Sequence, residues 1–151
     1  MILSIKCNYS VTIKWSLMVL IISLIALSNS LLFSQWKVIE ECNNRKSVYF
    51  TNSNTGWAVG NSGTIRKTTD GGTNWRPRTS GTTSHLYCIY FVDSNTGWTV
   101  GDGGTILISI DSVTTWTSQI SGTTNNLYGV YFVDSNSGWA VGNSGTILKT
   151  T

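Results

Sequence analysis

The stretch Asn54–Ile65, with the sequence NTGWAVGNSGTI, decides the fold because it occurs three times in the chain. It returns as NTGWTVGDGGTI at Asn95–Ile106 and as NSGWAVGNSGTI at Asn136–Ile147, at a spacing of 41 residues both times. Self-similarity at such a period indicates that one supersecondary unit is repeated. The residues in register are aromatic rings and glycines: Phe50, Phe91 and Phe132; Trp57, Trp98 and Trp139; Gly63, Gly104 and Gly145. Because they recur with the repeat, we interpret them as structural.

One repeat predicts four short antiparallel strands. In the second copy, runs of branched and aromatic residues at 86–92, 98–100, 105–110 and 116–119 are separated by clusters of turn residues. The glycines of Gly101–Gly104 permit a tight hairpin. Four such strands with nothing helical between them are typical of a β-propeller blade. The first run is apolar at nearly every position, which predicts a strand covered on both faces by neighbouring blades.

The segment Thr68–Trp75, with the sequence TTDGGTNW, closely matches the Asp-box turn of bacterial sialidase-type (BNR) repeats. In such a turn the Asp carboxylate accepts backbone N–H groups, a glycine takes the positive-φ position and the tryptophan packs back on the blade. The second box, at 109–116, keeps the acid and the tryptophan but has Val113 where glycine is expected. The structural residues expected in the two boxes are Asp70, Gly72, Trp75, Asp111 and Trp116.

Taken together, the Phe, the DSNTGW-type turn, the AVG and GTI stretches and the Asp-box resemble the repeats of the photosystem II assembly/stability factor-like β-propellers. The resemblance covers residues 47–151. It implies a seven-bladed ring and binding of a protein partner through basic surface residues. Because many exported proteins of non-photosynthetic bacteria carry the same repeat, it does not imply the photosynthetic role. The candidates for partner binding are Arg66, Arg76 and Arg78, all in the first copy.

The predicted fold is therefore all-β, with about 2.5 to 3 four-stranded blades of a larger ring. We expect a signal peptide or signal anchor at 1–34, then a lead-in at 35–46 with a candidate remnant outer strand at Trp36. The repeats are assigned to 47–87, 88–128 and 129–151, and the third stops inside its Asp-box. We interpret the chain as a fragment of a longer propeller; the alternative is assembly of several chains into one ring.

The first 34 residues have the order of a secretory signal. Lys6 and Lys14 precede an apolar run at 15–27, and small polar residues follow. A run of about 13 residues is short for a membrane-spanning helix, which needs roughly 20. An uncleaved anchor is the alternative, and only such an anchor would bring a membrane contact. In either case we expect export: secreted, cell-surface or periplasmic, or in the thylakoid lumen of a photosynthetic source.

Charge and cysteines restrict the function further. Removing residues 1–34 takes away two lysines and no acid, so the formal charge falls from +3 to +1. A near-neutral chain gives no electrostatic case for nucleic acid. Cys42 and Cys88 remain and could pair in an exported protein. However, Cys88 aligns with Ser47 and Gly129 in the other copies, which favours free thiols.

The sequence gives little support for an enzyme. A sialidase-like site would imply an arginine clamp, a Tyr nucleophile helped by a Glu, and an Asp acid, yet the only glutamates are the adjacent Glu40 and Glu41. The recurring residues are interpreted as packing or turn residues: Tyr49, Tyr90 and Tyr131 beside the repeated Phe, and Asp93 and Asp134 in the turns. The single histidine, His85, is expected to be solvated. We expect no cofactor and no metal.

The sequence thus predicts an exported, non-catalytic β-propeller that acts as a protein-binding or scaffolding module. One alternative is a photosystem II assembly/stability factor. The other is a sialidase-like glycan hydrolase whose catalytic residues lie outside this segment.

Overall fold

The computed structural model describes residues 45–111 and 115–150. All of them lie in the second of the two units into which the chain divides, Ile39–Thr151. The predicted signal segment at 1–34, the lead-in up to residue 44, Cys42 and Val113 lie outside the described residues.

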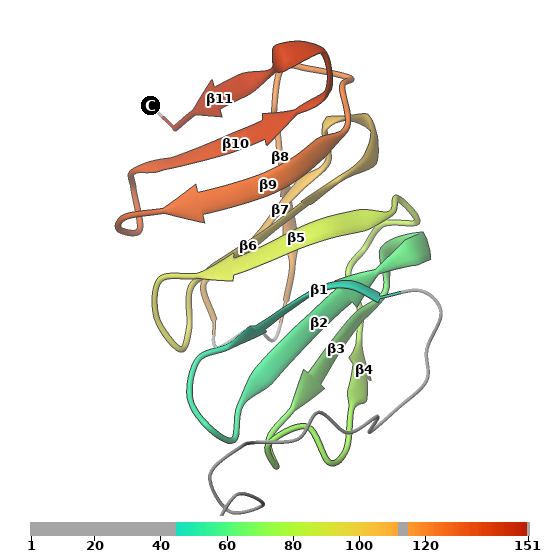
Figure 1. Cartoon of the computed structure of the whole chain (residues 1–151), viewed down its shortest axis with the longest axis vertical. Coiled ribbons are helices and arrows are strands. Elements are labelled where there is room, and N and C mark those ends of the chain that lie inside the picture. Colours follow the sequence, from blue (N-terminus) through green and yellow to red (C-terminus); the bar gives the residue numbers. More distant parts are fainter. Residues whose placement is uncertain (1–44, 112–114, 151) are drawn as a thin grey trace, which may run out of the picture. The chain divides into compact units, whose positions relative to one another are not determined.

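The described residues form three antiparallel sheets, each built from strands in chain order (Figure 1). Blade 1 has β1 (Arg45–Phe50), β2 (Gly56–Gly60), β3 (Ile65–Thr68) and β4 (Arg76–Arg78). Blade 2 has β5 (Leu86–Phe91), β6 (Gly97–Gly101), β7 (Ile106–Ser109) and β8 (Thr117–Gln119). Blade 3 has β9 (Leu127–Phe132), β10 (Gly138–Gly142) and β11 (Ile147–Lys149). A short 3₁₀ turn joins the second and third strands of each blade: η1 (Asn61–Gly63), η2 (Asp102–Gly104) and η3 (Asn143–Gly145).

This arrangement confirms the all-β prediction of propeller blades, with four strands in two blades and three in the last. The repeat boundaries at 87/88 and 128/129 fall inside β5 and β9, so each blade as a structural unit begins two residues before its assigned repeat. The second strand is longer than expected because Gly97 pairs with Phe91 and Gly101 pairs with Leu86.

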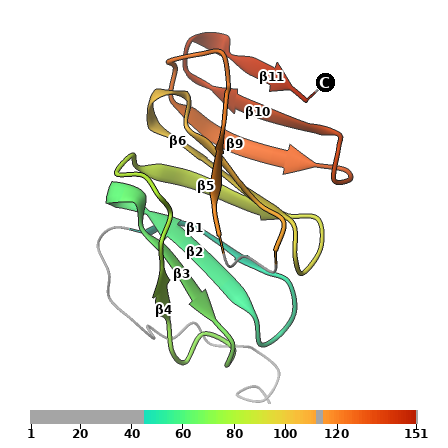
Figure 2. The ribbon, with the colours of Figure 1, turned by 180° about the vertical axis from the view of Figure 1, so that it is seen from behind.

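The prediction that neighbouring blades cover both faces of the first strand is confirmed for β5, because Leu86, Ile89 and Phe91 lie in the core with blade 1 while Cys88 and Tyr90 pack against the core with blade 3. In β5, Tyr87, Cys88 and Tyr90 are only half-buried. The strands that are buried at every position are the second ones, β2 and β6. A first strand has a neighbour on one side only within its sheet, whereas a second strand lies between two others. The first strands β1, β5 and β9 lie side by side, as Figure 1 and Figure 2 show.

Neighbouring blades are joined by a tryptophan of one blade that stacks on a phenylalanine of the next. Trp57 lies against Phe91 with ring centroids 5.6 Å apart and planes at 28°. Trp98 lies against Phe132 at 3.5 Å and 9°. Both indoles are buried, at 0% and 1% exposure. Trp139 has no following blade within the described residues and is 37% exposed.

Two apolar cores form around these stacks, one between each pair of neighbouring blades. The core between blades 1 and 2 contains Trp57, Val59, Ile65, Leu86, Ile89, Phe91, Leu107 and Trp116. The core between blades 2 and 3 contains Trp98, Val100, Leu127, Val130, Phe132 and Ala140. Each core takes residues from both blades, so neither blade buries its apolar face alone.

Glycines at two repeated positions let other groups approach closely. A Cβ atom on Gly97 would lie 2.3 Å from the Phe91 ring, so the ring fits only over a residue without a side chain. Gly104 has a φ of 73°, and a Cβ there would lie 2.0 Å from the Thr123 carbonyl oxygen. Both glycines are therefore required by the packing of the repeat.

The Asp-box of blade 1 is held by its acid, as the sequence predicts. The Asp70 carboxylate accepts hydrogen bonds from the Thr68 hydroxyl at 2.8 Å, the Asn74 backbone N–H at 2.9 Å and the Asn74 side-chain amide at 2.8 Å. The Gly72 N–H donates to the Thr68 hydroxyl at 2.9 Å. The Asn74 backbone, the Asn74 amide and the Thr68 hydroxyl lower the pKa of Asp70 to about 2. Trp75 then packs edge-on against Phe50, with centroids 6.0 Å apart.

The second box keeps this network although its sequence is degenerate. Asp111 accepts from the Ser109 hydroxyl at 2.9 Å, from the Thr115 N–H at 3.1 Å and from the Thr115 hydroxyl at 2.7 Å. Trp116 packs edge-on against Phe91 at 6.4 Å. The acid and the tryptophan thus maintain the same packing without the expected glycine.

Replacing Trp98 by alanine should lower the free energy of unfolding by about 3–5 kcal/mol, because a buried indole and its stack on Phe132 are lost. Replacing the half-exposed Trp139 should cost much less. Denaturant titrations of both variants measure the difference. Equal losses would show that the stack between blades 2 and 3 is assigned wrongly.

The Asp70 carboxylate should make blade 1 sensitive to acid. Its pKa of about 2 lies below the usual value of 3.8 for an aspartate, so the charged form stabilises the fold above about pH 4. This contribution should disappear as the pH falls from about 4 to about 2. Denaturant titrations of the wild type and the Asp70→Ala variant across this range should therefore converge toward low pH; a constant difference would contradict the account.

Candidate partner-binding surface

The three candidate arginines lie on the last two strands of blade 1, β3 and β4. In the register of β3 and β4, Lys67 opposes Arg76, Arg66 opposes Pro77 and Ile65 opposes Arg78. Directly opposed residues share a face of the sheet. Lys67, Arg76 and Arg78 therefore extend from one face and Arg66 from the other. We call these four residues the basic edge.

The cations of the basic edge differ in how firmly they are held. Arg76 and Arg78 are exposed, and the Arg78 guanidinium donates to the Pro77 carbonyl at 3.3 Å. Arg66 is half-buried, and its guanidinium donates to the Trp75 carbonyl at 3.3 Å. The Lys67 ammonium lies 4.6 Å from the centroid of the Trp57 ring. Arg66 and Lys67 are therefore anchored to the blade, whereas the Arg76 and Arg78 side chains are exposed among the described residues.

The pKa of Lys67 is shifted by its surroundings. Burial lowers its pKa from the usual value, and the positive charge of Arg78 lowers it further. Several positive charges thus lie close together at the basic edge, and this favours an acidic partner.

The architecture of a blade does not require these charges. The positions 41 residues further on, in blade 2, are Leu107, Ile108, Thr117 and Gln119. Blade 2 forms the same four strands with the same register and no cation there. The basic edge is therefore a departure from the repeat. Sequence reasoning identified its arginines but missed Lys67, for which the only signal was the apolar Ile108 at the matching position.

The tyrosines that could have served as nucleophiles pack against one another. Tyr49 and Tyr90 lie with centroids 5.4 Å apart, and Tyr90 and Tyr131 lie 4.9 Å apart. The Tyr49 hydroxyl donates to the Phe91 carbonyl at 2.9 Å. Burial, followed by the neighbouring tyrosines, raises the pKa of Tyr90. These groups are arranged as an interblade ladder and are not activated for attack.

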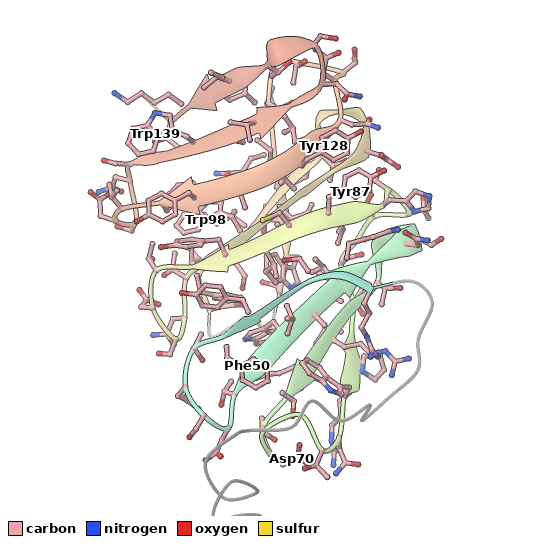
Figure 3. All side chains as sticks on the ribbon, in the orientation of Figure 1. Phe50, Asp70, Tyr87, Trp98, Tyr128 and Trp139 are labelled. Carbon is pink, nitrogen blue, oxygen red and sulfur yellow. The ribbon has the colours of Figure 1, made fainter. Side chains whose placement is uncertain are left out.

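A second tyrosine pair lies nearer the 3₁₀ turns, where Figure 3 shows Tyr87 and Tyr128 together. Their ring centroids are 4.9 Å apart. The Tyr87 hydroxyl donates to the Asp102 carboxylate at 2.6 Å. This bond, burial and the negative charge of Asp102 raise the pKa of Tyr87 to about 12. The acid keeps the phenol protonated, so this pair too is structural.

His85 is half-buried and does more than the sequence suggested, because it links two blades. Its Nδ1 atom accepts a hydrogen bond from the Ser62 N–H at 2.8 Å. One repeat later, the Asn126 side-chain oxygen accepts from the Gly103 N–H at 2.9 Å. Since histidine and asparagine share this acceptor role, the residue before β5 and the residue before β9 each connect to the 3₁₀ turn of the preceding blade.

The repeated turn acids are confirmed as turn residues. Asp93 accepts from the N–H groups of Asn95 and Thr96 at 2.6 and 2.7 Å, and Asp134 accepts in the same way from the two residues at 136 and 137. These bonds lower the pKa of both acids. Cys88 is half-buried and forms no disulfide among the described residues, and whether it pairs with Cys42, which lies outside them, is not tested.

Within residues 45–111 and 115–150, no group of three or more His, Cys, Asp or Glu side chains could hold a metal ion. The same part of the chain contains no helix long and apolar enough to cross a membrane.

The period, the four-stranded sheets and the Asp-boxes define the class of protein as a β-propeller built from BNR repeats. Residues 80–151 match the family model described as photosynthesis system II assembly factor YCF48. The finding confirms that these repeats are similar to those of the photosystem II assembly factor-like propellers. The matched range does not include the basic edge, which lies at 66–78. A comparison with curated proteins found no match.

Solved structures show the same relationship. The chain is similar to a structure described as YCF48 bound to D1 peptide, at 25% identity and a TM-score of 0.63, over 71% of this chain and 36% of that one. It is also similar in fold to YCF48 from Cyanidioschyzon merolae, at 24% identity and a TM-score of 0.67, over 78% of this chain and 40% of that one. The chain thus spans two fifths or less of the length of these relatives.

Proposed function

We propose that this chain is part of an exported, non-catalytic β-propeller that binds a protein partner, and that the basic edge of blade 1 is its partner-binding surface. The observation that carries the proposal is the group of four cations on β3 and β4, at positions where blade 2 has none. The proposed export rests on the signal-like sequence at 1–34.

The chemistry of the edge suits an acidic polypeptide segment. Arginine offers a planar fork of donors that can bind a carboxylate through two parallel hydrogen bonds. Arg76 and Arg78 are exposed and lie two residues apart on one strand, so they point to the same side. An extended segment with carboxylates at alternate residues would match this spacing. Pro77 lacks an N–H group, so the partner is held by side chains rather than by extension of the sheet.

A role as a photosystem II assembly factor is the more specific candidate. It is favoured by the family match and by the likeness to a relative described as bound to D1 peptide. In that case the partner of this chain would be a reaction-centre polypeptide of the D1 type. A sialidase-like activity would need catalytic residues outside the described part, since the tyrosines described here pack between blades.

The test is binding of the full chain to a synthetic D1 peptide, measured by calorimetry at low and moderate salt. Hydrogen bonds to charged groups contribute about 1.5–3 kcal/mol each. The triple variant Arg66→Ala, Arg76→Ala, Arg78→Ala should therefore bind at least about tenfold more weakly, and added salt should weaken the wild type.

Lys149→Ala is the matched control, because Lys149 occupies the same repeat position as Lys67 in another blade and also lies over a tryptophan. Its affinity should stay unchanged. Unchanged affinity of the triple variant would exclude the basic edge as the site. No binding of the wild type would exclude the D1 type of partner.

A further inference from the structure

Lys67 on β3 is held in one position against the blade. Its ammonium lies 4.6 Å from the centroid of the Trp57 ring, and Trp57 is its partner in the register of β2 and β3. An aromatic face attracts a lysine ammonium and so restricts an otherwise flexible side chain. The Trp57 indole is itself fixed by its stack on Phe91. The Lys67 amine therefore has a defined place, unlike the amine of a lysine that extends into solvent.

Two guanidinium groups lie on the same face of the sheet as this amine. Arg76 lies opposite Lys67 in the register of β3 and β4, and Arg78 lies two residues further along β4. Directly opposed residues of antiparallel strands have Cβ atoms about 4.5–5.5 Å apart. The positive charge of Arg78 acts on the Lys67 amine. Three cationic side chains are thus grouped on one face.

The charges of this group are not balanced by an acid of blade 1. Asp70 is the only acid between Arg45 and Arg78. Its carboxylate accepts hydrogen bonds from Thr68 and Asn74 within the Asp-box. Like charges at close range disfavour the charged form of a titratable group. Of the three cationic side chains, only the lysine can lose its proton in a protein.

The Lys67 amine has the properties of a nucleophile. Burial lowers its pKa, and Arg78 lowers the pKa further, so a larger share of the amine is neutral than in an exposed lysine. A neutral lysine amine next to other cations is the form that attacks carbonyl carbons. A reaction that replaces the ammonium by an anion also turns repulsion within the group into attraction, because a guanidinium can bind a carboxylate through two N–H donors.

We propose that Lys67 takes up carbon dioxide as a carbamate, and that Arg76 and Arg78 bind the carbamate oxygens. The ammonium first gives one proton to solvent. The amine nitrogen then attacks the carbon of CO₂, a C–N bond forms, one C=O electron pair moves to oxygen, and the nitrogen gives up a second proton. The group changes from three positive charges to two positive charges and one negative charge. The inference does not rest on the proposed function, and its test requires no partner.

Lys149 is the comparison within the same chain. It has the same position in the repeat and also lies over a tryptophan, with its ammonium 5.9 Å from the centroid of the Trp139 ring. Every arginine of the sequence lies in blade 1. Lys149 therefore has the aromatic contact without the guanidinium groups, and it should hold no carbamate.

The experiment exposes the full chain to increasing concentrations of CO₂ and bicarbonate near neutral pH. Carbamates are trapped with a trialkyloxonium salt and located by mass spectrometry of peptides. An alkoxycarbonyl group on Lys67 that saturates with CO₂ is expected, with none on Lys149. No product on Lys67, or equal amounts on the two lysines, would overturn the proposal.

A variant with Arg76→Thr and Arg78→Gln tests the role of the arginines. Blade 2 has Thr117 and Gln119 at the matching positions and forms the same strands. The CO₂ concentration at half occupancy of Lys67 should rise at least about tenfold, because hydrogen bonds between charged groups are lost. Acetylation of Lys67 by acetic anhydride gives a neutral product and should slow much less. Equal losses in the two reactions would show that the arginines act only on the amine, and would contradict their role in binding the carbamate.

Discussion

The stacking of an indole on a phenylalanine ring between consecutive blades is the interaction on which the rest of this structure depends. Trp57 covers Phe91, and Trp98 covers Phe132. Phe91 also contacts the Asp-box tryptophan of its own blade, Trp116. Phe91 is thus held from the preceding blade and from its own, and both Phe91 and Phe132 lie over a glycine that leaves room for the ring. Because every core is shared by two blades, a blade is stable only beside a neighbour, and this explains why the aromatic and glycine positions hardly vary among the copies.

Function must then be sought where the copies differ. The basic edge replaces two apolar and two neutral polar residues of blade 2 with cations and leaves the strand register unchanged. Thr99 is a difference of another kind, since its hydroxyl is buried without a hydrogen-bond partner among the described residues, where the other copies have Ala58 and Ala140. The first difference gives the surface a charge that a partner can recognise; the second has only a local cost in desolvation.

Much of the fold could be predicted from the sequence, because a repeat of 41 residues shows three times which positions are constant. The period located the strands, the Asp-box acids and the stacked aromatic residues.

The period could not show which strand is buried at every position, since that depends on whether a strand has one or two neighbours in its sheet. Nor could it reveal the role of His85, which becomes clear only when its Nδ1 atom is seen next to the Ser62 N–H. Lys67 was missed because only the register of β3 and β4 shows that it lies opposite Arg76.

The central claim is that the blades are coupled through these aromatic stacks, and a double-mutant cycle on Trp98 and Phe132 tests it most directly. Denaturant titration would give the free energies of unfolding of Trp98→Ala, Phe132→Ala and the double variant. A second cycle with Trp98→Ala and Phe50→Ala, two residues that do not stack on each other, serves as the comparison. The account predicts a coupling energy of about 0.5–1.5 kcal/mol for Trp98 with Phe132 and additive effects for the comparison pair. Additive effects for both pairs would contradict it.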